Sequence, residues 1–278
     1  MFSYLGGKKF QAKWIASQFP KHNTYVEPFG GAYWVYFMAN HQIDQAHTNV
    51  YNDFNKDIAN IFHCARYDDR KFLKSLLSYE DQNEELFNQF KSELFPLNTD
   101  FELGDVDRAT KYLYLQTQSF SGDTLTEKTK FVNLKGKYKS KYQHFIDKIS
   151  DKKWLYFIKG INHIHNESYE TIIDMYDKED TLFYVDPPYY KMEDYYVQDF
   201  QRSQHLELAN KLKSIKGKFV LSYYDFPQLQ EWFPKNEFRW VSKEFSKANS
   251  TTSKKKTTSR GEEILIMNFN TVNPALTL

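Results

Sequence analysis

An acid, two prolines and two aromatic residues follow one another at positions 186–190, directly after the apolar run 181–185. Proline cannot donate to a sheet ladder, so a strand containing that run must end at Pro187. The prolines stiffen the turn and leave the carbonyls of Asp186 and Pro187 as rigidly placed acceptors. The ring of Tyr189 adds a flat face on which a planar heterocycle can stack. These residues describe a pocket for an exocyclic amine on a base, although a plain polar turn would use the same residue types.

The elements that position this turn can be read from the apolar pattern. The run 181–185 has no polar alternation, which is typical of a strand covered on both faces. Another short strand is predicted at 24–27, followed by the turn Phe29-Gly30-Gly31 and a helix that begins near Ala32. This order places backbone amides and a helix N-terminus beside a small anionic ligand group. The spacing differs from the glycine fingerprint of dinucleotide enzymes, so a plain tight turn is the alternative.

A further strand is predicted within residues 47–57, and it ends in polar residues. An acid at the tip of the second strand of such a unit is placed to accept hydrogen bonds from ribose hydroxyls. Asp53 is the preferred candidate. Asp57 fits better in the first turn of the following helix, 58–64, where an acid favours the positive end of the helix dipole.

The N-terminal segment carries a glycine pair and a lysine ahead of a predicted helix that contains Trp14, Ile15 and Phe19. The glycines permit close backbone approach to a ligand, and Lys8 can meet a carboxylate or a phosphate. A flexible N-terminal turn explains the same residues.

Composition limits the class of protein. The chain has 278 residues, 41% hydrophobic and 26% charged, which suits one large soluble domain or a domain with an insertion. A net charge of +1 argues against a uniformly basic nucleic-acid coat. The single cysteine, Cys64, excludes an internal disulfide and a multi-cysteine metal site. No stretch approaches the roughly 20 apolar residues of a membrane span, and a reducing cytoplasm is the expected compartment.

Four segments, in this order along the chain, resemble the Dam-type (class alpha) DNA adenine N6-methyltransferases. They are Tyr4-Leu5-Gly6-Gly7-Lys8, Val26-Glu27-Pro28-Phe29-Gly30-Gly31, Asn52-Asp53-Phe54-Asn55-Lys56-Asp57 and Asp186-Pro187-Pro188-Tyr189. The stretches 219–223 and 262–268 also look like the next strand and the closing strand of that family. The resemblance covers both flanks of the chain, while the middle matches poorly.

The resemblance implies an α/β fold, a Rossmann-like S-adenosylmethionine-dependent methyltransferase sheet with helices on both faces. Residues 1–64 and 176–278 would form the catalytic domain. Residues 65–175 would form a target-recognition, DNA-binding insertion that is mainly helical and carries a basic hairpin.

The resemblance also assigns roles to residues. Those expected to bind S-adenosylmethionine are Tyr4, Lys8, Glu27, Pro28, Phe29, Gly30, Gly31, Asp53, Phe54 and Asp186. Those expected to receive a flipped adenine from duplex DNA, and so to be catalytic, are Asp186, Pro187, Pro188 and Tyr189. The implied activity is that of a site-specific DNA-methyltransferase (adenine-specific).

Basic side chains in two tracts are candidates for contacts with DNA phosphates. The first tract, 121–142, interleaves lysines with aromatic residues, and the second, 246–260, is rich in Ser, Thr and Lys. The candidates are Lys128, Lys130, Lys135, Lys137, Lys139, Lys254, Lys255, Lys256 and Arg260. A solvated lysine-rich loop is the alternative for the first tract, and a disordered segment for the second.

Other acceptors and partners stay open at this point. RNA adenine or a protein amide would suit a similar proline-aromatic loop, and a non-catalytic DNA-recognition subunit is a further alternative. No metal is expected, because the histidines offer no convergent set of three ligands. The target sequence, the oligomeric state and a cognate restriction enzyme as partner are not determined by these residues.

Overall fold

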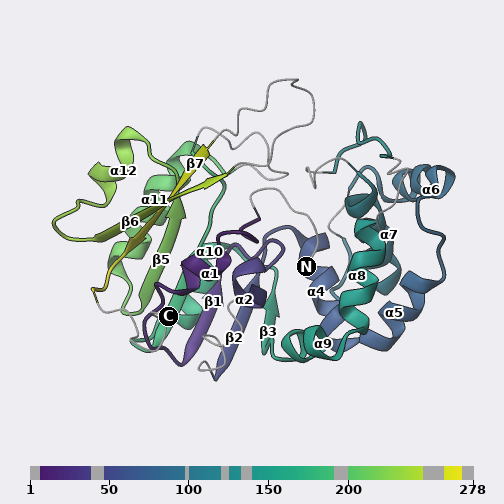
Figure 1. The fold of residues 1–278 in the computed structure, drawn as a ribbon, viewed down its shortest axis with the longest axis horizontal. Helices are drawn as coiled ribbons and strands as arrows, with labels where there is room; N and C mark the ends of the chain where they lie inside the picture. Colours follow the sequence, from purple (N-terminus) through teal and green to yellow (C-terminus); the bar gives the residue numbers. More distant parts are fainter. Residues whose placement is uncertain are drawn as a thin grey trace.

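The structure, a computed structural model, describes residues 7–38, 47–97, 100–119, 125–132, 140–190, 200–246 and 260–270, apart from the side chains of Ser246 and Arg260. These residues form a seven-stranded sheet with helices on both faces, and a lobe of helices lies beside one edge of the sheet (Figure 1). The sheet and its two helical layers confirm the α/β fold that the sequence predicts.

The strands are β1 (Thr24–Glu27), β2 (Thr48–Asn52), β3 (His163–His165), β4 (Thr181–Val185), β5 (Lys218–Tyr223), β6 (Arg239–Ser246) and β7 (Arg260–Met267). Their order across the sheet is β3-β2-β1-β4-β5-β7-β6. Neighbouring strands from β3 to β5 are parallel, whereas β7 runs antiparallel between β5 and β6. The sequence predicts five of these strands, while β3 and β6 are found only in the structure.

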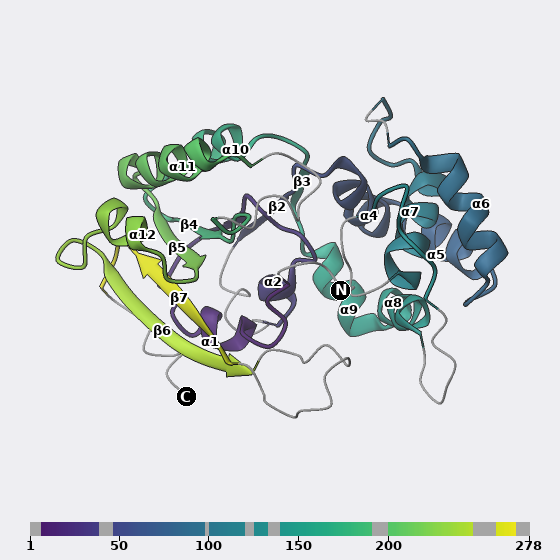
Figure 2. The same ribbon diagram turned by 90° about the horizontal axis from the view of Figure 1, so that it is seen from above.

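Both faces of β4 are buried, as expected for a strand without polar alternation. Leu182 and Tyr184 join the core beneath α1 (Ala12–Ala16) and α2 (Trp34–Met38). Phe183 and Val185 face α10 (Tyr169–Tyr176), α11 (Arg202–Ser214) and α12 (Pro227–Trp232). Seen from above, these two groups of helices lie on opposite sides of the sheet (Figure 2).

The helical lobe contains α4 (Lys56–Tyr67), α5 (Asp69–Leu77), α6 (Glu84–Leu94), α7 (Val106–Gln118), α8 (Lys141–Ser150) and α9 (Lys152–Lys159). Nearly every residue of α7 is buried, because α4, α5, α6 and α8 all pack against it. Helix α4 packs against both α7 and β3, so it joins the lobe to the sheet.

The structure shows which elements lie within the predicted insertion. Residues 141 and 142, expected in a basic hairpin, open helix α8, and the Tyr142 hydroxyl donates to the Leu76 carbonyl at 2.8 Å. The expected range 65–175 also includes β3, which pairs with β2, and most of α10. These short elements escaped prediction because β3 has three residues and its pairing is set by β2, which is distant in the chain.

Candidate active site

A cavity of about 380 Å³ lies at the carboxyl ends of β1, β2 and β4. In the chain, β1 is followed by α2 and β4 by α11, and these two helices lie on opposite sides of the sheet (Figure 2). Open α/β sheets bind ligands between two neighbouring strands whose connections diverge in this way. The residues that line the cavity are Gly7, Lys8, 27–35, 53–55, 168–170, Tyr184, Asp186, Pro188, Tyr189, Phe200 and Gln204.

The glycine turn after β1 is packed directly onto β2. A Cβ atom at position 30 would lie 2.4 Å from Cε2 of Tyr51 and 2.8 Å from the carbonyl oxygen of Asn52. The Gly30 amide donates to that same carbonyl at 2.7 Å. Gly30 is therefore required by the close approach of two backbone segments, which brings the turn to the cavity wall.

Asp53 joins this turn to the start of α4. Its Oδ2 accepts from the Gly31 amide at 2.7 Å, and its Oδ1 accepts from the Asn55 amide at 2.8 Å. Burial raises the pKa of Asp53 to about 6, although the two backbone donors oppose the shift. The carboxylate both lines the cavity and holds the turn in place.

Aromatic rings form one wall of the cavity. Phe29 stacks on Tyr169 with ring centroids 5.4 Å apart, and Phe200 meets Phe29 edge-on at 5.7 Å. Phe54 is 58% exposed although it lines the cavity. Tyr169 and Phe200 were missed by the sequence analysis, because neither belongs to a motif and both lie outside the strand ends considered there.

A lysine and an acid, Lys8 and Asp186, line another part of the cavity, and a second acid, Glu263, contacts this lysine. The Nζ of Lys8 lies 3.1 Å from Oδ1 of Asp186 and 3.2 Å from Oε1 of Glu263. Glu263 Oε1 also accepts from the Tyr189 hydroxyl at 2.6 Å and from the Ser222 hydroxyl. Lys8 also contacts the Tyr189 hydroxyl, and its Nζ lies 4.5 Å from the centre of the Tyr189 ring. Asp186 and Tyr189 are thus held from two sides.

Burial and neighbouring charges change the protonation of this cluster. Burial raises the pKa of Asp186 to about 7; the Lys8 ammonium opposes this shift and the Glu263 carboxylate adds to it. Burial alone would lower the pKa of Lys8, but Asp186 and Glu263 raise it overall, so the ammonium stays charged. Asp186 can therefore change protonation near neutral pH while Lys8 does not.

The cavity brings together most of the residues singled out in the sequence. Lys8, Pro28 to Gly31, Asp53, Phe54, Asp186, Pro188 and Tyr189 all line it. Glu27 lines it too, and its Oε1 accepts from the Tyr25 hydroxyl at 2.6 Å and the Tyr36 amide at 3.3 Å. Pro187 is buried beside the cavity without lining it. Tyr4 lies outside the described residues.

Glu263 is the main residue of the site that the sequence analysis missed. It lies on β7, within the stretch 262–268 that resembles the family's closing strand but to which no role was assigned, and it is 7% exposed. An acid directly adjoining the apolar residues 264–267 is the signal that could have identified it, because a buried charge requires a partner.

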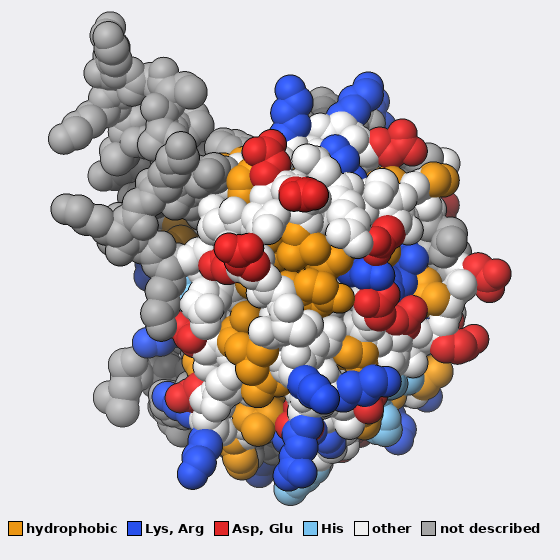
Figure 3. Space-filling view, turned by 90° about the vertical axis from the view of Figure 1, so that its right-hand side faces the viewer, with side chains coloured by type: hydrophobic (Ala, Val, Ile, Leu, Met, Phe, Trp, Pro, Cys, Tyr) orange, Lys and Arg blue, Asp and Glu red, His pale blue; other side chains and the backbone are white. Residues whose placement is uncertain are grey.

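The lysines expected to contact DNA are only partly described. Lys128 and Lys130 are exposed, whereas Lys135, Lys137, Lys139, Lys254, Lys255, Lys256 and the side chain of Arg260 lie outside the described residues. On the outer face of the helical lobe, acidic and basic side chains are mixed (Figure 3). That face does not resemble a uniformly basic DNA-binding surface.

The described residues hold no group of three or more His, Cys, Asp or Glu side chains that could bind a metal ion. Among the same residues, none of the helices has the length and apolar character needed to cross a membrane.

Comparison with known proteins agrees with this geometry. The family model for D12 class N6 adenine-specific DNA methyltransferases matches residues 4–249. A type II methyltransferase, M.CviBI, from Paramecium bursaria Chlorella virus NC1A is 23% identical over 222 residues, which cover 78% of this chain and 80% of the viral protein.

Proposed function

The chain belongs to the D12 class N6 adenine-specific DNA methyltransferase family, and on that premise we propose that it transfers a methyl group from S-adenosylmethionine to N6 of an adenine flipped out of duplex DNA. One observation carries the proposal. The Gly30-Gly31 turn and the turn that holds Asp186 and Tyr189 line the same cavity, so a methyl donor and a base can meet there.

The residues of the cavity suit S-adenosylmethionine. The Asp53 carboxylate is placed to accept from ribose hydroxyls, and the rings of Phe29, Phe54 and Tyr169 suit a purine. The hydroxyl of Tyr184 is buried at the cavity without a hydrogen-bond partner among the described residues, so a polar ligand would satisfy it. Tyr4, Lys8, Glu27, Pro28, Gly30, Gly31 and Asp186 complete the proposed set of donor-binding residues.

The donor would supply a methyl group made electrophilic by the sulfonium charge. Asp186 and the Pro187 carbonyl would accept the two hydrogens of the adenine amine, which favours a pyramidal, more nucleophilic nitrogen. As the N–CH3 bond forms and the S–CH3 bond breaks, leaving S-adenosylhomocysteine, Asp186 would take the proton that the nitrogen loses. Tyr189 would stack on the base and offset part of the few kcal/mol needed to extrude it. Lys8 and Glu263 hold Asp186 and Tyr189 in place for both tasks.

We propose that residues 65–175 form the target-recognition insertion, which would bind the DNA substrate. Residues 1–64 and 176–278 would form the catalytic domain. The likeness to a type II methyltransferase supports a role in a restriction-modification system, in which a cognate restriction enzyme would be the partner.

An acceptor assay tests the proposal. The protein is incubated with labelled S-adenosylmethionine and, separately, with duplex DNA, RNA or unfolded protein. We expect label only in duplex DNA, and methylation-aware sequencing should place it on N6 of adenine at one short sequence. Label in RNA or protein, or binding of DNA without any transfer, would refute the proposed reaction.

The proposed phosphate contacts predict a change in salt dependence. Replacing both Lys128 and Lys130 by Gln should reduce the slope of log K against log salt for duplex DNA by about 0.9 per lost contact. Binding should weaken equally for all sequences, because phosphates carry no sequence information. Two exposed lysines just before β5, Lys213 and Lys216, replaced together by Gln, provide a charge-matched control. Unchanged slopes would exclude these two lysines from the DNA interface.

A further inference from the structure

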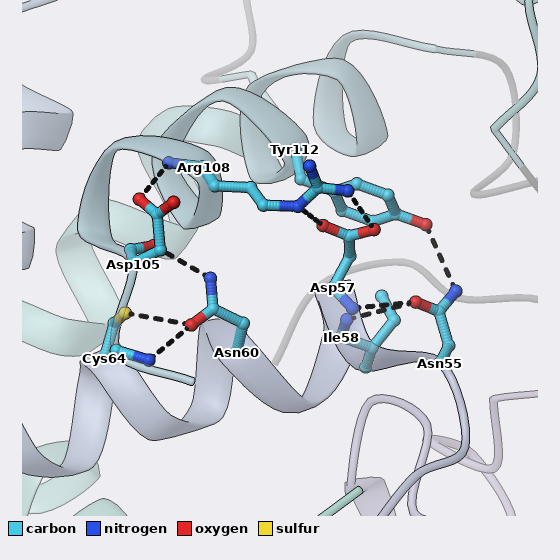
Figure 4. Close-up of polar contacts among 9 residues, drawn as sticks. Asn55, Asp57, Ile58, Asn60, Cys64, Asp105, Arg108 and Tyr112 are labelled. Atoms are coloured by element: carbon cyan, nitrogen blue, oxygen red, sulfur yellow. Dashed lines mark hydrogen bonds and ion pairs between the residues drawn. The ribbon is translucent and has the colours of Figure 1, made fainter. Parts of the chain in front are cut away.

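Helix α4 links two functional parts of the molecule. It begins three residues after Asp53, which lines the cavity, and it packs against α7, the central helix of the lobe. Buried polar contacts join the two helices along their facing sides (Figure 4). Such contacts cost free energy to bury unless they are fully satisfied, so their number at this boundary calls for an explanation.

The strongest contact is an ion pair between Arg108 of α7 and Asp57 of α4. Arg108 Nε lies 2.6 Å from Oδ1 of Asp57, and Nη2 lies 3.0 Å from Oδ2. The two residues are 9% and 6% exposed, respectively. A bidentate ion pair of this kind fixes the orientation of α7 relative to the first turn of α4, and it also fixes the distance between the two helices.

Asn60 makes a second attachment one turn further along α4. Its Nδ2 donates to the Asp105 carbonyl at 2.8 Å, and its Oδ1 accepts from the Gly104 amide at 2.7 Å. Asp105 is also the N-cap of α7. Asn60 thus holds the start of α7 in a fixed register on α4.

Asn55 connects α7 to the cavity. Its Nδ2 donates to the Tyr112 hydroxyl of α7 at 3.3 Å, while its Oδ1 caps α4 by accepting from the Asp57 and Ile58 amides. The backbone amide of the same residue donates to Asp53 Oδ1 at 2.8 Å. Asp53 in turn holds the Gly31 amide. A continuous series of hydrogen bonds therefore runs from the lobe to the glycine turn.

We propose that Tyr112 and Arg108 are positioning residues for the methyl-donor site. The packing of the helical lobe against α4 and the binding of the donor at Asp53 are then coupled. This inference rests on the proposed function, because it takes Asp53 to bind the donor. Any shift of α7 on binding DNA would change the hydrogen bond to Asn55, and with it the orientation of Asp53. By thermodynamic linkage, donor binding would then favour the DNA-binding arrangement of the lobe by the same factor.

A matched pair of tyrosines on α7 provides the test. Tyr112 and Tyr114 are both buried and hydrogen-bonded, but the Tyr114 hydroxyl donates to the Glu80 carbonyl at 2.8 Å, inside the lobe. Tyr112→Phe and Tyr114→Phe each remove one buried hydroxyl from the same helix. Only Tyr112→Phe breaks the series that leads to Asp53, and it leaves the buried Nδ2 of Asn55 without its partner.

The measurements are the Kd of S-adenosylhomocysteine by calorimetry, with and without duplex DNA, and the thermal midpoint of each variant. Tyr112→Phe should raise Kd about five- to tenfold, from the usual effect of a lost buried hydrogen bond. Tyr114→Phe should leave Kd within about twofold despite a similar fall in the thermal midpoint. DNA should tighten donor binding in the unmodified protein and do so less in Tyr112→Phe. Adding Tyr112→Phe to Asp53→Asn should have little further effect.

The outcomes separate this inference from the proposed function. Equal effects of the two tyrosine variants on Kd would overturn the positioning role, because a purely structural interface would not distinguish them. If Asp53→Asn weakens binding but Tyr112→Phe does not, the donor site stands and the coupling fails. If the unmodified protein does not bind S-adenosylhomocysteine, the proposed function and this inference both fail.

Discussion

Each end of the cavity is built around an aspartate, buried at position 53 and partly buried at position 186, but the two carboxylates are held by different kinds of partner. Asp53 accepts from the Gly31 and Asn55 amides, which belong to the backbone. Asp186 faces the Lys8 ammonium, with Glu263 behind it. Burial is the largest cause of the raised pKa at both sites, yet the next causes are backbone hydrogen bonds at Asp53 and the full charges of Lys8 and Glu263 at Asp186.

This difference suggests a division of labour. Backbone amides keep their positions as long as the turn and α4 are folded, so Asp53 presents an unchanging acceptor. Side chains of lysine and glutamate can rotate and change their contacts when a ligand arrives. The first arrangement suits the binding of a cofactor that is the same in every cycle, and the second suits the proton-linked chemistry of a substrate amine.

The largest expected effect separates the two carboxylates by function. Asp186→Ala should reduce kcat by at least about a thousandfold, because it removes the principal acceptor for the reacting amine. Donor binding should persist in that variant, weakened far less than kcat, because Asp53 and the Phe29 ring still line the donor end of the cavity; calorimetry measures this affinity. Near-normal turnover on adenine-containing DNA would refute the role assigned to Asp186.

Asp53→Asn should show the reverse pattern. One of its two carboxylate oxygens becomes an amide that faces a backbone N–H group, so the donor KM should rise about tenfold or more. The kcat at saturating donor should change far less, and steady-state kinetics would measure both. An equal loss of kcat in the two aspartate variants would remove the distinction between the two ends of the cavity.

Gly30→Ala tests whether the Asp53 end depends on backbone packing. The added methyl group would overlap the Tyr51 ring and the Asn52 carbonyl, so the turn must move. We expect a loss of about 1–3 kcal/mol of folding free energy, measured by denaturant unfolding, together with weaker donor binding. Ala32→Gly, two residues along the same turn, removes a methyl group and is the control for general flexibility. Normal donor affinity in Gly30→Ala would show that the position of the turn is not decisive.

Glu263→Gln tests the charged end and should have the smallest effect. Asp186 must be ionised to accept from the amine, so kcat/KM should fall as the pH drops below about 7. The negative charge of Glu263 raises the pKa of Asp186. Removing this charge should therefore shift the acidic side of the profile of kcat/KM against pH to lower pH. A profile of kcat/KM against pH for both proteins measures the shift. An acidic side that stays in place would mean that Glu263 acts only through packing and hydrogen bonds.

The local pattern was enough to predict much of the catalytic part. The burial of 181–185 on both faces follows from a run without polar alternation, the strand predicted at 24–27 is present, and the proline pair ends β4 where expected. Asp57 does lie in the first turn of α4, although the helix is longer than predicted and spans Lys56–Tyr67. The helix expected near Ala32 begins at Trp34. Such features depend on neighbouring residues, which the sequence displays directly.

The sequence by itself determined which residue types stand at the ends of the central strands, and through them the family and the class of chemistry. Only the tertiary structure decided that Lys8, Asp186 and Glu263, which are far apart in the chain, form one cluster. It also decided that Arg108 would pair with Asp57 and that Tyr112 would reach Asn55. The reason is physical: a strand end follows from local sterics and hydrogen-bonding capacity, whereas the partner of a buried charge depends on how distant elements pack.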